Sequence, residues 1–106
     1  MAKVSIYRND LAQVIPPDGT YYFAIGPWDE FRDGAITVTA HPYPTALAAS
    51  RRYMEVVQMA TRVSNQNPDA GFWLDIVVRN NGHVGTGADS INGFAVYTSV
   101  ILRDED

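Results

Sequence analysis

The fold class of this chain is decided by residues 54–63, MEVVQMATRV. Traced back to Thr45, the apolar residues recur at steps of three and four, which favours an amphipathic helix. Read as a strand, the segment presents on one face Tyr53, Val57, Met59, Thr61 and Val63, with Glu55 as the exception. A polar turn at residues 65–71 leads directly into another strand, an arrangement typical of a β-meander. We therefore predict a strand at 54–63 after a loop or short helical turn at 45–52; the alternative is a helix near 45–63, which would make the fold α+β.

The segment that follows, residues 72–79 (FWLDIVVR), has the clearest strand pattern in the chain. The face expected to line the core carries Phe72, Leu74, Ile76 and Val78. The opposite face carries Trp73, Asp75, Val77 and Arg79. Asp75 needs a partner such as an arginine if that face is covered, and is ordinary if the face is exposed.

Four more segments alternate or are rich in β-branched and aromatic residues, and we expect them to be strands: 3–7, 20–25, 34–40 and 94–102. The half-buried faces are expected to carry Val4 and Ile6 in the first and Ile36 and Val38 in the third. Turn-forming residues separate the strands at Pro16–Gly19, Gly26-Pro27, Asn80–Gly82 and Asn92-Gly93. The pattern predicts one domain, residues 1–106, folded as an all-β antiparallel sandwich of about six or seven strands.

Composition narrows the function classes. The 106 residues carry a formal net charge of −4, opposite to the positive surface that binds nucleic acid, so we expect no nucleic-acid partner. There is no cysteine, hence neither a disulfide framework nor a thiolate metal site. No apolar run resembles a signal peptide or reaches the length of a membrane span, so we expect a soluble domain, and the compartment stays open.

Catalytic motifs are sparse. The two histidines, His41 and His83, lie 42 positions apart and cannot form a helical ligand pair, and the acidic residues show no calcium-binding ladder. No Gly-x-Ser-x-Gly motif surrounds any serine, and the glycines of residues 82–87 do not match a dinucleotide-binding loop. We therefore expect no metal and no cofactor. The remaining enzymatic hypothesis is a small hydrolase or isomerase that pairs His41 or His83 with a carboxylate.

Aromatic residues near strand ends are the better candidates for a binding site. They are Trp28, Tyr43 and Trp73, with His41 beside Tyr43. Ring faces with nearby hydrogen-bond donors hold sugars or dock protein partners. The alternative is that both tryptophans fill the open ends of a small core.

Residues 53–102 resemble the immunoglobulin-like β-sandwich modules of the cell-adhesion-related (CARDB-like) type. The residues that carry the likeness are Glu55–Thr61, a polar turn, Leu74–Gly82 with its V-x-N-x-G ending, and Phe94–Leu102. The resemblance implies a non-enzymatic binding, adhesion or spacer role and supplies no defined site.

We expect a module for protein interaction or structural assembly. Two open sheets leave edge strands, and a chain with one lysine has few of the residues that block edge pairing, so we expect a homo-oligomer. The alternatives are a carbohydrate-binding module using Trp28, Tyr43 and Trp73, and the hydrolase or isomerase above.

Overall fold

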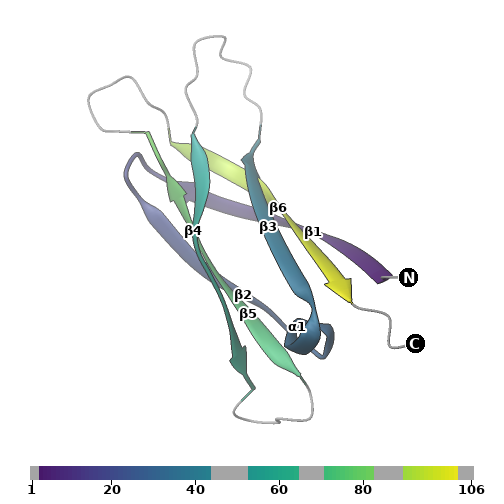
Figure 1. Ribbon diagram of the computed structural model, residues 1–106. Helices are drawn as coiled ribbons and strands as arrows, with labels where there is room; N and C mark the ends of the chain where they lie inside the picture. Colours follow the sequence, from purple (N-terminus) through teal and green to yellow (C-terminus); the bar gives the residue numbers. More distant parts are fainter. Residues whose placement is uncertain (1–2, 44–52, 65–70, 83–89, 103–106) are drawn as a thin grey trace.

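Two three-stranded antiparallel sheets make up the fold, with strand orders β1-β6-β3 and β2-β5-β4 (Figure 1). The computed structural model describes residues 3–43, 53–64, 71–82 and 90–102. The elements within them are β1 (Lys3–Ile15), β2 (Thr20–Trp28), α1 (Glu30–Asp33), β3 (Ala35–Pro42), β4 (Met54–Val63), β5 (Phe72–Asn80) and β6 (Ile91–Leu102). The predicted all-β sandwich is confirmed.

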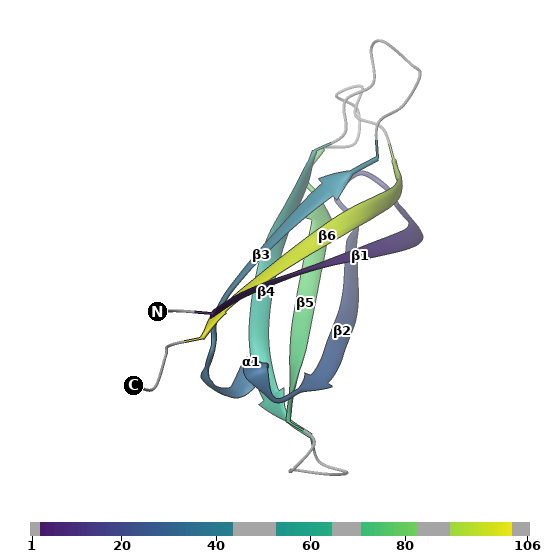
Figure 2. The ribbon, with the colours of Figure 1, turned by 90° about the vertical axis from the view of Figure 1, so that its right-hand side faces the viewer.

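The two sheets face each other across an apolar core, and Figure 2 shows them as two layers whose strands cross at an angle. The central strands β5 and β6 supply most of the fully buried side chains: Leu74, Ile76, Val78, Ile91, Phe94, Val96 and Val100. Alternation on β5 places the core face where the sequence pattern predicts it. Burial of these residues by the opposite sheet is the main force that holds the layers together.

Residues 54–63 form a strand, as predicted, and pair with β5 in the second sheet. The register shifts between Val56 and Gln58, so Val57 is an extra residue on the edge strand. Val57, Met59 and Val63 stay exposed because β4 lies at the sheet margin. The predicted loop or helical turn at 45–52 lies outside the described residues.

The first strand differs from the prediction. We expected Val4 and Ile6 to be half buried, but they are 57% and 68% exposed, and Tyr7 points inward instead. The strand runs to Ile15, which is buried. A period of two fixes one face along the whole strand, and Ile15 in the core sets the odd-numbered residues inward.

Two predicted strand breaks lie inside strands. Asn92-Gly93 belongs to β6, where Gly93 has a φ of 85°, and Gly26-Pro27 belongs to β2, where the register shifts between Ile25 and Trp28. Pairing with long neighbouring strands carries both segments through these local irregularities.

The predicted turn at Pro16–Gly19 is present, closed by a hydrogen bond from the Gly19 N–H to the Pro16 carbonyl oxygen at 2.8 Å. Asp18, rather than Gly19, takes the positive φ of 64°. Aspartate tolerates this conformation, so the turn places Asp18 third and glycine fourth.

Candidate functional site

The outer face of the β1-β6-β3 sheet carries a cluster of polar and aromatic side chains, which we call the sheet-face cluster. Its members are Arg8 and Asp10 of β1, Tyr97 of β6, His41 of β3 and Tyr43 just after β3. Residues more than eighty positions apart meet here, because β6 lies between β1 and β3 and pairs Arg8 with Tyr97 and Thr39 with Tyr97.

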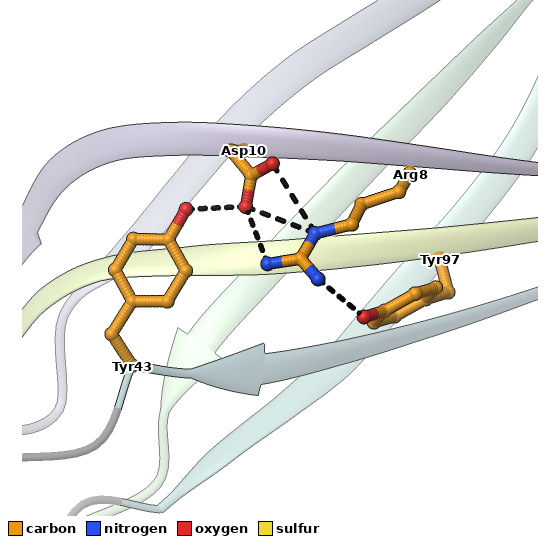
Figure 3. Close-up of polar contacts among 4 residues, drawn as sticks. All are labelled: Arg8, Asp10, Tyr43 and Tyr97. Atoms are coloured by element: carbon orange, nitrogen blue, oxygen red, sulfur yellow. Dashed lines mark hydrogen bonds and ion pairs between the residues drawn. The ribbon is translucent and has the colours of Figure 1, made fainter.

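Arg8 lies at the centre of the hydrogen bonds in this cluster (Figure 3). Its Nε and Nη2 donate to the Asp10 carboxylate at 3.0–3.2 Å, and its Nη1 donates to the Tyr97 hydroxyl at 2.9 Å. The guanidinium also lies over the Tyr97 ring, 5.4 Å from its centroid. Tyr43 donates its hydroxyl to Asp10 at 2.5 Å from the other side.

A glycine gives Tyr43 room to reach Asp10. The Tyr43 N–H donates to the Gly93 carbonyl oxygen at 3.1 Å, which anchors the residue against β6. A Cβ at position 93 would lie 2.8 Å from the Tyr43 ring, closer than carbon atoms approach in proteins. The bare glycine thus lets the ring lie across β6 toward β1.

The contacts fix the charge states of three cluster members. Hydrogen bonding from Arg8, then from Tyr43, holds the pKa of Asp10 below its usual value. The bond to Asp10 raises the pKa of Arg8 and that of Tyr43. At neutral pH the three groups are a carboxylate, a guanidinium and a protonated phenol. They therefore provide fixed charges and hydrogen bonds and do not exchange protons in this range.

His41 lies on the β3 side of the cluster. One ring nitrogen is 3.3 Å from the Thr39 hydroxyl, and the ring meets Tyr97 edge-on at 5.6 Å between centroids. Within the described ranges, the His41 ring has no carboxylate partner. His83, the other histidine of the hydrolase hypothesis, lies outside the described residues.

An apolar strip adjoins the cluster on the same face. It consists of Val4 and Ile6 of β1 and Ile101 of β6, and Val4 and Ile101 are direct cross-strand partners. All three side chains are exposed, Ile101 at 45% and the other two above half. Since alternate residues share a face, the strip continues directly into Arg8 and Asp10.

Trp73, another of the predicted binding residues, lies on the outer face of the opposite sheet. The Arg62 guanidinium lies over it, 5.3 Å from the ring centroid. The same arginine pairs with Asp75 at 2.8 Å, and Asp75 also accepts a 2.7 Å hydrogen bond from the Tyr22 hydroxyl. Asp75 is only 19% exposed because Arg62 and Tyr22 bond to it, and the arginine supplies the partner that this shielding requires.

Trp28 packs at one end of the core. Its ring lies 4.6 Å from that of Tyr7 and 5.1 Å from that of Phe31, measured between centroids. Phe31 belongs to α1, a four-residue helix that the sequence pattern did not indicate. Tyr7 also donates its hydroxyl to Glu30 of that helix, which raises the pKa of Tyr7. Trp28 thus has the core-filling position that was the alternative to binding.

Of the four predicted site residues, the structure brings together His41 and Tyr43, and it places Trp28 and Trp73 elsewhere. Sequence reasoning missed Arg8, Asp10 and Tyr97. Arg8 and Asp10 were detectable as an opposite-charge pair two positions apart in an alternating segment. Tyr97 had no such signal, because its place depends on the pairing of β6 with both neighbours.

In the part of the chain that the structure describes, no three acidic or histidine side chains gather in a way that could hold a metal ion. The described residues also include no helix with the length and apolar character to cross a membrane. No family model matches the chain, and neither the curated proteins nor the solved structures include a significant match to it.

Proposed function

We propose that this domain is a non-enzymatic module for protein interaction and structural assembly, and that it docks through the outer face of the β1-β6-β3 sheet. The observation that carries the proposal is the apolar strip, exposed beside the sheet-face cluster. Tyrosine and arginine are the side chains most often found at the energetic centres of protein interfaces, and here Tyr97 and Arg8 stand next to exposed aliphatic groups.

The exposure of the strip is costly for an isolated domain. Val4, Ile6 and Ile101 leave apolar area in water on a face that could have carried polar residues throughout. Contiguous apolar patches rimmed by polar groups are typical of interaction sites. The likeness of residues 53–102 to adhesion-related sandwich modules favours the same role.

The occupied ring faces favour a protein partner over a sugar. Sugars stack on flat, accessible aromatic faces. Arg8 lies over Tyr97, Arg62 lies over Trp73, and Trp28 packs into the core. Stacking of a sugar on Trp73 would require Arg62 to move away, and Trp28 is packed against the core. Arginine and aromatic side chains are instead enriched at protein interfaces.

The test compares two matched substitutions of exposed aliphatic residues. Ile6→Arg places a charge in the apolar strip, and Val57→Arg places the same charge on the edge strand of the other sheet. Sedimentation velocity over a wide concentration range should show association of the unmodified chain that Ile6→Arg abolishes and Val57→Arg preserves. Circular dichroism of both variants checks that they fold.

Two outcomes contradict the proposal. One is a chain that stays monomeric at every concentration. The other is association that Val57→Arg disrupts while Ile6→Arg has no effect, since the docking surface would then lie on the other sheet. Titration of tryptophan fluorescence with oligosaccharides, if it gave a saturable response, would favour the carbohydrate-binding alternative.

A further inference from the structure

Strand β1 is an edge strand that pairs with β6 on one side, and its other side pairs with no strand among the described residues. Its 13 residues make it longer than the other edge strands β2, β3 and β4, with 9, 8 and 10 residues. The other three carry interruptions: Gly26-Pro27 in β2, Pro42 in β3 and the extra residue Val57 in β4. Proline and bulges protect edges from pairing; β1 has its own register break between Leu11 and Val14, but its run from Lys3 to Leu11 has neither and is the longest such run among the described edge strands.

The outward-facing residues of β1 form a self-complementary series. In order they are Val4, Ile6, Arg8, Asp10, Ala12 and Val14, and all six are exposed. The series reads apolar, apolar, positive, negative, small apolar, apolar, with Asn9 at its midpoint. A second copy that runs antiparallel, related by a two-fold axis at Asn9, would present the same series in reverse order along the first.

We propose that two copies of this chain associate by antiparallel pairing of their β1 strands about a two-fold axis at Asn9, which joins the β1-β6-β3 sheets into one continuous six-stranded sheet. This inference rests on the proposed role in assembly and places a second copy along the β1 edge, beside the sheet face on which the sheet-face cluster lies. Arg8 then lies opposite Asp10 of the second copy, Ile6 opposite its Ala12, and Val4 opposite its Val14. Opposite charges and apolar side chains that face each other directly across strands stabilise antiparallel pairs.

Charge selects this register over its neighbours. Moving the axis by one residue to Arg8 or to Asp10 sets like charges directly against each other, which is unfavourable. An axis between two residues would turn the core face of one copy to the outside of the joined sheet. With the axis at Asn9, the core faces of the two copies lie on the same side of the joined sheet. Each Arg8 then faces an Asp10 of the other copy.

The inward-facing side of β1 also fits this register. Tyr7 comes opposite Leu11 of the second copy, so apolar side chains meet on that face as well. Asn9 lies on the axis, and its side-chain oxygen is shielded from solvent without a hydrogen-bond partner among the described residues. At the axis the two Asn9 side chains would lie directly opposite each other, which offers this oxygen the amide of the second copy as a donor. The register break between Leu11 and Val14 falls among the outer pairs, which involve Ala12 and Val14, so the central run of residues 7–11 carries the pairing.

Charge reversal in trans tests the register. Arg8→Asp gives a chain with acids at both positions 8 and 10, beside the axis. Asp10→Arg gives a chain with arginines at both positions. Each variant alone should associate about tenfold or more weakly than the unmodified chain, because two attractive pairs become repulsive. An equimolar mixture should restore a one-to-one dimer, since every facing pair is again of opposite charge. A purely structural role of the Arg8–Asp10 pair within one chain could not produce rescue by mixing.

Cross-linking provides a second readout that does not depend on the charged pair. The chain has no cysteine, so Asn9→Cys introduces a single thiol that should form a disulfide dimer across the axis. Val4→Cys is the control on the same strand, because its two copies lie about 30 Å apart in this register. Equal cross-linking of both variants, or no rescue in the mixture, overturns the register. If Ile6→Arg still abolishes association in that case, the proposed function stands and only the edge pairing is wrong.

Discussion

Asn80 is the side chain whose loss should most directly reveal how the two sheets are held together. It is buried at the end of β5. Its Nδ2 donates to the Ile15 carbonyl oxygen at 2.9 Å, and its Oδ1 accepts from the Gly82 N–H at 3.0 Å. Ile15 ends β1 in the other sheet, so one amide group connects both layers.

The substitution Asn80→Ala removes the side-chain amide, so the Ile15 carbonyl oxygen and the Gly82 N–H each lose their hydrogen bond to it. Each stranded buried group costs about 1–3 kcal/mol. Taking the lower half of that range, since water can enter at a strand end, we expect a loss of about 3 kcal/mol in the free energy of unfolding. For a domain of this size that corresponds to a melting temperature lower by about 15 °C.

Urea unfolding followed by tryptophan fluorescence measures the loss. Asn81→Ala is the matched control, because Asn81 is exposed and the hydrogen bond that it donates to the Tyr53 carbonyl oxygen comes from its backbone N–H; the substitution should cost less than about 0.5 kcal/mol. Asn80→Asp keeps the acceptor for Gly82 but sets an oxygen against the Ile15 carbonyl, so it should also destabilise the chain at neutral pH. The reasoning is refuted if Asn80→Ala and Asn81→Ala unfold at the same urea concentration.

Two further predictions concern the sheet faces and the cluster. Ile76→Ala should cost about 2–5 kcal/mol by the same urea assay, and Ile6→Ala less than about 1 kcal/mol, because Ile76 is fully buried and Ile6 is exposed; equal costs would contradict the inward and outward assignment. The pKa of Asp10 is lowered in the folded chain, so its stabilising contribution is complete above the pKa of an unfolded aspartate and is lost as the pH falls through the lowered value. Carboxyl-carbon NMR should show this lowered pKa and its return toward the usual value in Arg8→Ala; an unchanged pKa in that variant would rule out the Arg8 contact as its main cause.

Much of the fold could be predicted from the sequence because local patterns agree with the tertiary environment. The alternation in residues 72–79 identifies a central strand and its core face, since a period of two leaves one consistent apolar side. The Pro16–Gly19 turn follows from proline and glycine chemistry. The strand at 54–63 was the closer decision, and pairing with β5 settles it against the helical periodicity of the same residues.

The cluster could be predicted only in part. His41 and Tyr43 stand out as an aromatic pair at a strand end, and the structure places them on one face. Their contact with Arg8 and Asp10 depends on β6 lying between strands that are distant in the sequence. No local pattern encodes which strand pairs with which, so Tyr97 gave no signal.

The sequence by itself determined the core face of β5 and the Pro16–Gly19 turn, and it favoured the sandwich class, because these depend on residue type and on spacing over a few positions. The tertiary structure decided which face of β1 is exposed. The local pattern allows either Val4 and Ile6 or Ser5 and Tyr7 to face inward, and the burial of Ile15 fixes the choice. It also decided that Asn92-Gly93 continues a strand and that Tyr43 crosses Gly93 to reach Asp10. These outcomes are set by register and by long-range burial, whose free energy exceeds the local preferences of a few residues.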